Sequence, residues 1–141
     1  FALPAAYGAK MAQPEREVVA IIGDGGFQMN IQELGTIFQS KIPVKIIVLN
    51  NNFLGMVRQW QELFFDKRYA STELINPDFI TIAKGYSFET NKIEERKDLE
   101  SALQTMLDYD GHYFLEVIVE QEGNVFPMIP AGASVSECRL S

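Results

Sequence analysis

Two apolar segments of the chain, residues 17–22 and 44–49, each end in residues whose types suit a metal ion and a phosphate. The first segment runs into Gly23-Asp24-Gly25-Gly26, and the second runs into three asparagines at residues 50–52. Mg²⁺ prefers oxygen ligands and usually shares them with the phosphates of its substrate. The two segments together therefore favour a site for a magnesium-bound diphosphate.

Each candidate ligand has a separate part in such a site. Asp24 offers a carboxylate, Asn51 offers a neutral amide oxygen, and a main-chain carbonyl near Phe53 could supply a third ligand. Gly25 and Gly26 lack a Cβ, so phosphate oxygens can approach their N–H groups closely. The helix expected after them points the positive end of its dipole at the same place. One carboxylate only partly offsets the charge of Mg²⁺, and a diphosphate supplies the rest.

Both patterns also have an ordinary explanation. A Gly-Asp-Gly-Gly segment is a common tight turn, and asparagines are common in the loops that follow strands. The two patterns gain weight because they fall at matching ends of two neighbouring strands. The dinucleotide pattern G-x-G-x-x-G is not complete, because Gln28 stands where the last glycine belongs, and the Walker segment G-K-[ST] is absent.

The elements that must hold these residues alternate between strands and helices. Apolar segments predict buried strands over residues 17–22, 44–49 and 113–119. Small or apolar residues at helical spacing predict helices over residues 3–12, 31–40, 56–64, 77–84 and 99–107. This alternation predicts an α/β fold, with a parallel sheet flanked by helices in a doubly wound three-layer sandwich. Ligands of such sheets bind outside the carboxyl ends of the strands, where both polar segments fall.

Local signals indicate where some helices begin and end. Asn76 followed by Pro77 predicts an N-cap and the first residue of a helix that Gly85 ends, and Asp98 is expected to cap the last helix. The polar residues 123–141 are expected to pack along the surface. No internal repeat or linker divides the chain, so residues 1–141 are expected to form one domain.

Charge and composition exclude several classes of partner. The 141 residues include 12 Lys and Arg against 19 Asp and Glu, which gives a formal net charge of -7. Nucleic acid is not an expected partner, because no basic stripe is present to bind a phosphate backbone. A membrane is not expected either, because no apolar stretch approaches the roughly 20 residues of a span. No signal peptide is visible at the start of the chain.

The chain has one cysteine and one histidine, and neither predicts a reactive site. Cys138 cannot form an intramolecular disulfide, which fits a reducing compartment, and we expect no catalytic role for it. His112 follows Gly111 and is expected in a turn or at the edge of a strand.

The polar segments also resemble a known signature. Gly23-Asp24-Gly25, then 24 residues, then Asn50-Asn51 is similar to the signature of thiamine diphosphate enzymes. This resemblance implies that Asp24, Asn51 and the main-chain oxygen of Phe53 bind Mg²⁺. It also implies that Gly23, Gly25 and Gly26 line the diphosphate.

Other segments resemble acetolactate synthases, which are also called acetohydroxyacid synthases. Residues 56–61, Met-Val-Arg-Gln-Trp-Gln, resemble the segment beside the active site of that family. The resemblance implies that Met56 borders the cofactor, while Val57 and Trp60 line the substrate channel. The same three side chains also form one apolar face of a helix. Residues 1–9, 68–69, 76–79 and 126–132 resemble the same family, so the resemblance covers nearly the whole chain.

The resemblance implies the C-terminal part of a large catalytic subunit. Such an enzyme condenses pyruvate with a second 2-keto acid, with loss of CO₂, in branched-chain amino-acid biosynthesis. Family members are several times longer and carry a pyrimidine-binding domain with the activating Glu and a central domain that holds FAD in many members. We therefore expect residues 1–141 to be an N-terminally truncated thiamine diphosphate domain with no catalytic residue of its own. The family also implies a dimer or tetramer, leaves room for a regulatory small subunit, and implies a cytoplasmic location, or a plastid in a plant or alga.

Two alternatives stay open. A pyruvate oxidase or decarboxylase would share the cofactor signature, although residues 56–61 and 126–132 favour acetolactate synthase. The chain could also be a non-catalytic binding module that only associates with partner chains. Exposed apolar surface would favour the binding module, and turnover of pyruvate by the isolated chain would contradict it.

Overall fold

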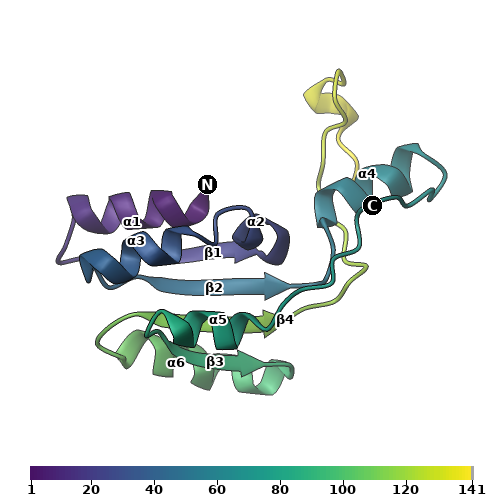
Figure 1. Ribbon diagram of the computed structural model, residues 1–141. Helices are drawn as coiled ribbons and strands as arrows, with labels where there is room; N and C mark the ends of the chain where they lie inside the picture. Colours follow the sequence, from purple (N-terminus) through teal and green to yellow (C-terminus); the bar gives the residue numbers. More distant parts are fainter. Residues whose placement is uncertain (141) are drawn as a thin grey trace.

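Four parallel strands form the frame of the computed structural model, which describes residues 1–140. The strands lie side by side in the order β1 (Val19–Gly23), β2 (Lys45–Asn50), β4 (Tyr113–Ile118) and β3 (Glu89–Ile93), as Figure 1 shows. Gly23 pairs with Leu49 in the parallel register of β1 and β2. The loops that follow these two strands therefore leave the same edge of the sheet.

Helices cover both faces of this sheet (Figure 1). One face carries α1 (Ala2–Ala12), α2 (Asp24–Gln28), α3 (Glu33–Ser40) and α5 (Phe79–Gly85), and the other carries α6 (Leu99–Asp108). Short 3-10 helices lie at Arg96–Asp98 and Val135–Glu137. Layers on both sides of a parallel sheet confirm the predicted three-layer α/β sandwich.

The core under the larger helical layer is aromatic. Phe27, Phe79 and Phe114 have no exposed surface. The ring of Phe27 meets that of Phe79 edge to face at 5.1 Å between centroids and that of Phe114 at 5.3 Å. Tyr113 and Leu115, the neighbours of Phe114 in β4, face α6 instead, because successive side chains of a strand alternate between the two faces.

Strand β1 is half-buried, whereas the sequence pattern predicted a fully buried strand. Ala20 and Ile22 lie in the core, but Ile21 is 64% exposed on the other face. The cause is the position of α6, which covers β2, β4 and β3 and leaves the second face of β1 open. A short apolar run does not reveal how far the helices of a layer extend.

Two other local expectations differ from the structure. The N-cap of α5 is Asp78 and not Asn76, because the Asp78 side chain accepts a hydrogen bond from the Thr81 N–H at 3.0 Å. Asp98 is the N-cap of α6 by position, but its side chain makes no capping bond. The pattern also does not predict β3, a polar edge strand in which only Ile93 is buried.

The helix α4 (Gly55–Phe64) and the C-terminal residues project together beyond the carboxyl edge of the sheet (Figure 1). The surface that residues 123–140 pack along is that of α4, where the Arg139 guanidinium lies over the Phe64 ring at 5.2 Å. Ser141, the last residue of the predicted surface segment, lies outside the described residues. Among residues 1–140, no helix has both the length and the apolar composition that crossing a membrane requires.

His112 lies just before β4, which agrees with the predicted strand edge. Its ring packs on that of Phe88 at 5.0 Å between centroids, and its carbonyl accepts a hydrogen bond from the Glu89 N–H at 3.0 Å. Within the described residues, the His112 Nδ1 is buried without a hydrogen-bond partner. Burial, and secondarily the charge of Lys45, lowers the pKa of His112 below its ordinary value of 6.5.

The pKa of His112 predicts a pH dependence of folding. Because its pKa is lower in the folded than in the unfolded chain, proton uptake favours unfolding, and the stability present above pH 6.5 is lost as the pH falls through the folded pKa. Urea titrations between pH 7.5 and about 5.5 should show a falling free energy of unfolding. His112→Phe, which keeps the packing on Phe88, should flatten that slope, and an unchanged slope would contradict the assignment.

Phe27 is expected to be a main support of the core. Phe27→Ala should lower the free energy of unfolding by about 3–5 kcal/mol, because it removes a fully buried ring that contacts two others. Phe38→Ala is the matched control, since that ring is 47% exposed, and about 0.5 kcal/mol or less is expected. Denaturant unfolding of both variants checks the difference, and equal losses would contradict it.

Candidate functional site

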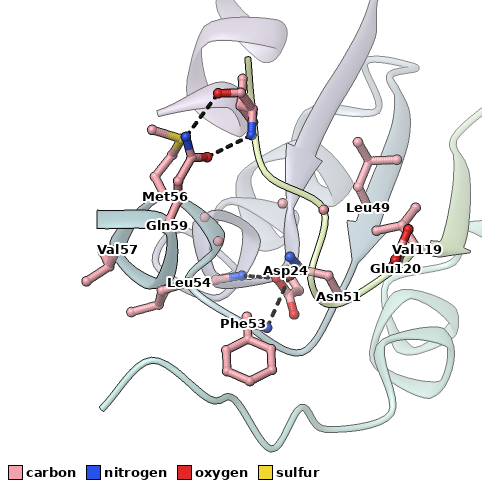
Figure 2. Close-up of a pocket in the computed structure, with 16 residues that line it drawn as sticks. Asp24, Leu49, Asn51, Phe53, Leu54, Met56, Val57, Gln59, Val119 and Glu120 are labelled. Atoms are coloured by element: carbon pink, nitrogen blue, oxygen red, sulfur yellow. Dashed lines mark hydrogen bonds between the residues drawn. The ribbon is translucent and has the colours of Figure 1, made fainter. Parts of the chain in front are cut away.

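The two polar loops meet around one cleft at the carboxyl edge of β1 and β2. The cleft has a volume of about 440 Å³, and Figure 2 shows it with α4 on one side and the ends of β2 and β4 on the other. Eight of the nine predicted site residues line it: Gly23, Asp24, Gly25, Gly26, Asn51, Phe53, Met56 and Val57. Trp60 does not line this cleft; it lies further along α4, 38% exposed, with its ring 5.3 Å from that of Phe64.

Asp24 is the first residue of α2, and its side chain is buried although it lines the cleft. Its Oδ1 accepts a hydrogen bond from the Gly25 N–H at 2.9 Å, and its Oδ2 accepts one from Asn76 Nδ2 at 2.7 Å. Gly25 and Gly26 belong to this short helix rather than to a turn before it. The first N–H groups of a helix have no main-chain partner within it, so this end of α2 suits an anion, although the Gly25 N–H already donates to the Asp24 Oδ1.

Asn51 and Phe53 form the opposite loop. The Asn51 Oδ1 accepts a hydrogen bond from the Phe53 N–H at 3.1 Å. Phe53 also pairs with Glu73 in an isolated antiparallel bridge. The hydrogen bonds of this bridge run from the Leu54 N–H to the Thr72 carbonyl and from the Leu74 N–H to the Asn52 carbonyl, each at 2.8 Å. In such a bridge the N–H and C=O of the central residue point away from the partner segment. The Phe53 carbonyl therefore lies on the same side as the Asn51 side chain.

The three consecutive asparagines have different structural roles. Asn50 is buried, and its Nδ2 donates to the Glu116 Oε1 at 2.7 Å. Asn52 turns the chain with a positive φ of 56°, and its N–H donates to the Asn50 Oδ1 at 3.1 Å. Only Asn51 lines the cleft, which agrees with its choice as the candidate ligand from spacing.

The charged side chains that line the cleft are both acidic. They are Asp24 and Glu120, and no lysine, arginine or histidine joins them. Among residues 1–140, no group of three or more His, Cys, Asp and Glu side chains is placed to hold a metal ion. A cation in this cleft would therefore bind one buried carboxylate together with neutral oxygens and an anionic ligand. That donor set fits Mg²⁺ bound to a diphosphate.

The wall formed by α4 is held by two polar side chains that the sequence patterns do not single out. Arg58 is buried, with its Nη1 3.1 Å from the Glu62 Oε2 and its guanidinium 5.8 Å from the centre of the Phe53 ring. Gln59 accepts from the Val125 N–H at 2.7 Å and donates to the Val125 carbonyl at 3.0 Å. The apolar spacing of α4 gives no signal for them, because it marks Met56, Val57 and Trp60, which are exposed on this helix while Arg58 and Gln59 are buried.

The model of the C-terminal TPP binding domain of thiamine pyrophosphate enzymes matches residues 1–117. The chain belongs to this family. Membership confirms the predicted fold and the thiamine diphosphate cofactor, since thiamine pyrophosphate is another name for the same compound.

The curated relatives that this domain matches include acetolactate synthases. The chain is 50% identical over 138 residues to the acetolactate synthase isozyme 2 large subunit of Escherichia coli (strain K12), covering 97% of this chain and 25% of the relative. It is 43% identical over 148 residues to acetolactate synthase 1, chloroplastic, of Oryza sativa subsp. japonica, covering 99% and 23%. The resemblance predicted from the sequence is confirmed, although the chain spans only about a quarter of these relatives.

A solved structure supports the same family. The thiamine diphosphate-dependent 4-hydroxybenzoylformate decarboxylase of Rhodococcus jostii RHA1 matches with a TM-score of 0.78 and 32% sequence identity. The match covers 86% of this chain and 23% of the decarboxylase. Related domains thus occur in enzymes with different reactions.

Gly25 is expected to be required for the packing of this thiamine diphosphate domain. A Cβ at Gly25 would lie 2.5 Å from the Leu54 Cδ2 and 3.2 Å from the Leu74 Cδ1, so Leu54 would have to move. Gly25→Ala should cost roughly 1–3 kcal/mol from overpacking, which a gain of about 1 kcal/mol from helix propensity reduces to a net loss of up to about 2 kcal/mol of stability.

Gly23→Ala provides the matched control, measured by denaturant unfolding beside Gly25→Ala. No atom lies within 4 Å of a Cβ at Gly23, whose φ of -74° suits any residue. Its effect should stay within about 0.5 kcal/mol. Equal losses in the two variants would contradict the role assigned to Gly25.

Proposed function

We propose that this chain binds the diphosphate end of thiamine diphosphate through Mg²⁺ in the cleft between α2 and α4. The Asp24 carboxylate, the Asn51 amide oxygen and the Phe53 main-chain oxygen are the proposed metal ligands. The observation that carries the proposal is the meeting of Asp24, Asn51 and Phe53 in one cleft whose charged lining is acidic. Gly23, Gly25 and Gly26 line the diphosphate in this proposal.

Electrostatics makes the cation necessary. A diphosphate carries several negative charges, and in this cleft it would approach the buried Asp24 without any cationic side chain to offset the repulsion. Two unit charges about 4 Å apart interact by about 4 kcal/mol near a protein surface. An ion bound to both the carboxylate and the phosphates turns this repulsion into attraction.

We further propose that the whole enzyme is an acetolactate synthase, a transferase that joins pyruvate to a second 2-keto acid with loss of CO₂ in branched-chain amino-acid biosynthesis. Relatives that carry this name are 40% to 50% identical to the chain over nearly its full length. When bound, thiamine diphosphate supplies an electron sink for breaking the carbon–carbon bond of a 2-keto acid. The residues of this chain hold the diphosphate, Met56 borders the cofactor, and Val57 and Trp60 line the substrate channel.

No catalytic acid or base is assigned within these residues. Asp24 is occupied as a metal ligand in the proposal, and Glu120 is exposed. The activating Glu and any FAD site are proposed to belong to the pyrimidine-binding and central domains of the whole enzyme, so the isolated chain is expected to bind cofactor without turnover.

Exposed apolar side chains on α4 support an assembled enzyme. Met56, Val57 and Phe64 are 50%, 49% and 38% exposed on this helix. We propose that they are covered in a dimer or tetramer, which can also bind a regulatory small subunit. The proposed location is the cytoplasm of a bacterium or the plastid of a plant or alga.

A decarboxylase is the second candidate, favoured by the 4-hydroxybenzoylformate decarboxylase that shares the fold. Product analysis on the whole enzyme separates the two reactions. An acetolactate synthase releases a condensed hydroxy-keto acid from pyruvate, whereas a decarboxylase releases the aldehyde.

The binding proposal is tested by calorimetric titration of the purified chain with thiamine diphosphate, with and without Mg²⁺. Binding should require Mg²⁺, because the cleft offers no other cation. Asp24→Ala should weaken binding at least about tenfold, a loss of about 1.4 kcal/mol or more. The control is Glu120→Gln, which removes the other acidic charge of the cleft and should bind like the unmodified chain. Binding that persists without Mg²⁺, or that survives Asp24→Ala, would refute the proposed ligand set.

A further inference from the structure

One side chain connects the two loops that carry the proposed metal ligands. Asn76 lies in the extended segment before α5, and its Nδ2 is 2.7 Å from the Asp24 Oδ2. The same nitrogen is 2.9 Å from the Asn50 Oδ1 and 3.1 Å from the Asn52 Oδ1. Asn76 therefore contacts the residue after β1 and the loop after β2 at the same time.

The chemistry of its neighbours fixes the orientation of the Asn76 amide. An ionised carboxylate only accepts hydrogen bonds, so the group facing Asp24 must be the NH₂. On the other side, the Gln28 Nε2 donates to the Asn76 Oδ1 at 2.6 Å. The two hydrogens of the Asn76 NH₂ are shared among three acceptors, the side-chain oxygens of Asp24, Asn50 and Asn52.

Asn76 reaches Asp24 from behind the cleft. Asp24 and Asn51 line the cleft, whereas Asn50, Asn52 and Asn76 line a separate cavity of about 640 Å³. Each carboxylate oxygen has two lone pairs, so the hydrogen bond to Asn76 leaves room for a ligand on the cleft side. The pair of Asn50 and Glu116, 2.7 Å apart and both buried, anchors the far end of this network.

We infer that Asn76 is a positioning residue for the metal site, which holds the Asp24 carboxylate in the orientation that the ion needs and fixes it relative to the Asn51 loop. The inference rests on the proposed function. Capping of α5 does not account for Asn76, because Asp78 makes that contact. A carboxylate that is already held in place loses less conformational freedom when the ion binds, so metal affinity depends on Asn76.

The experiment measures Mg²⁺-dependent affinity for thiamine diphosphate, together with the melting temperature, for the chain and its variants. Asn76→Ala should lower the affinity about 10- to 100-fold, the usual effect of removing a partner of a metal ligand. Asp78→Ala is the matched control from the same segment, since it removes the cap of α5 without touching Asp24. It should lower the melting temperature and leave the affinity within about twofold, far less than a tenfold step of 1.4 kcal/mol.

Gln28→Ala is a second variant that tests the inference even if Asn76→Ala does not fold, because unchanged metal-dependent affinity in Gln28→Ala alone would overturn it. Gln28→Ala leaves Asn76 in place but removes the donor that orients its amide. It should weaken metal-dependent binding by less than Asn76→Ala does. In the double variant, the loss should equal that of Asn76→Ala alone, because Gln28 acts only through Asn76. Full additivity would overturn this account.

The outcomes separate the inference from the function on which it rests. If Asp24→Ala abolishes binding but Asn76→Ala binds as tightly as the unmodified chain, the positioning role is refuted and the metal site stands. If Asn76→Ala and Asp78→Ala lose affinity equally, Asn76 is only structural and the inference fails. If the unmodified chain binds no cofactor in the presence of Mg²⁺, the proposed function fails and the inference fails with it.

Discussion

The parallel pairing of β1 with β2 is the constraint on which the site depends. Gly23 lies opposite Leu49, so the residues that follow both strands emerge at one edge of the sheet. An antiparallel pairing would separate Asp24 from Asn51 by the length of a strand, which for five residues is roughly 16 Å. Parallel strands need a crossover, and α2 and α3 supply it while their buried faces build the aromatic core. The pairing thus creates the core and the site together.

The polar groups behind the cleft must be satisfied for this arrangement to persist. Asp24, Asn50 and Glu116 are all buried, and a buried polar group without a partner costs about 1–3 kcal/mol or more. Hydrogen bonds running from Gln28 through Asn76 to Asn50 and Glu116 satisfy them. A connected network of this kind favours one arrangement of its members over alternatives. The rigidity that a metal site needs therefore follows from the same bonds that make burial of these side chains tolerable.

The two walls of the cleft are supported in different ways. The wall made by α2 packs on the sheet through Phe27. The helix α4 stands away from the sheet (Figure 1) and is held by the Arg58 guanidinium over the Phe53 ring and by the hydrogen bonds between Gln59 and Val125. The α4 wall also carries exposed apolar residues, including Met56 and Val57. Few buried apolar contacts mean lower local stability. The chain spans about a quarter of the length of the relatives it matches.

The sequence by itself determined the α/β class, the strands β1, β2 and β4, and the two segments that meet at the cleft. It could do so because apolar runs predict strands locally, and because parallel neighbouring strands bring the residues after their carboxyl ends to the same edge of the sheet. Only the tertiary structure decided that Ile21 faces solvent, that β3 forms the sheet edge, and that Trp60 lies outside the cleft. It also decided that Asn76 contacts Asp24 across 52 residues instead of capping α5. These outcomes depend on which elements pack together. Hydrogen bonds between side chains far apart in sequence produce no repeating pattern of residue types from which they could be predicted.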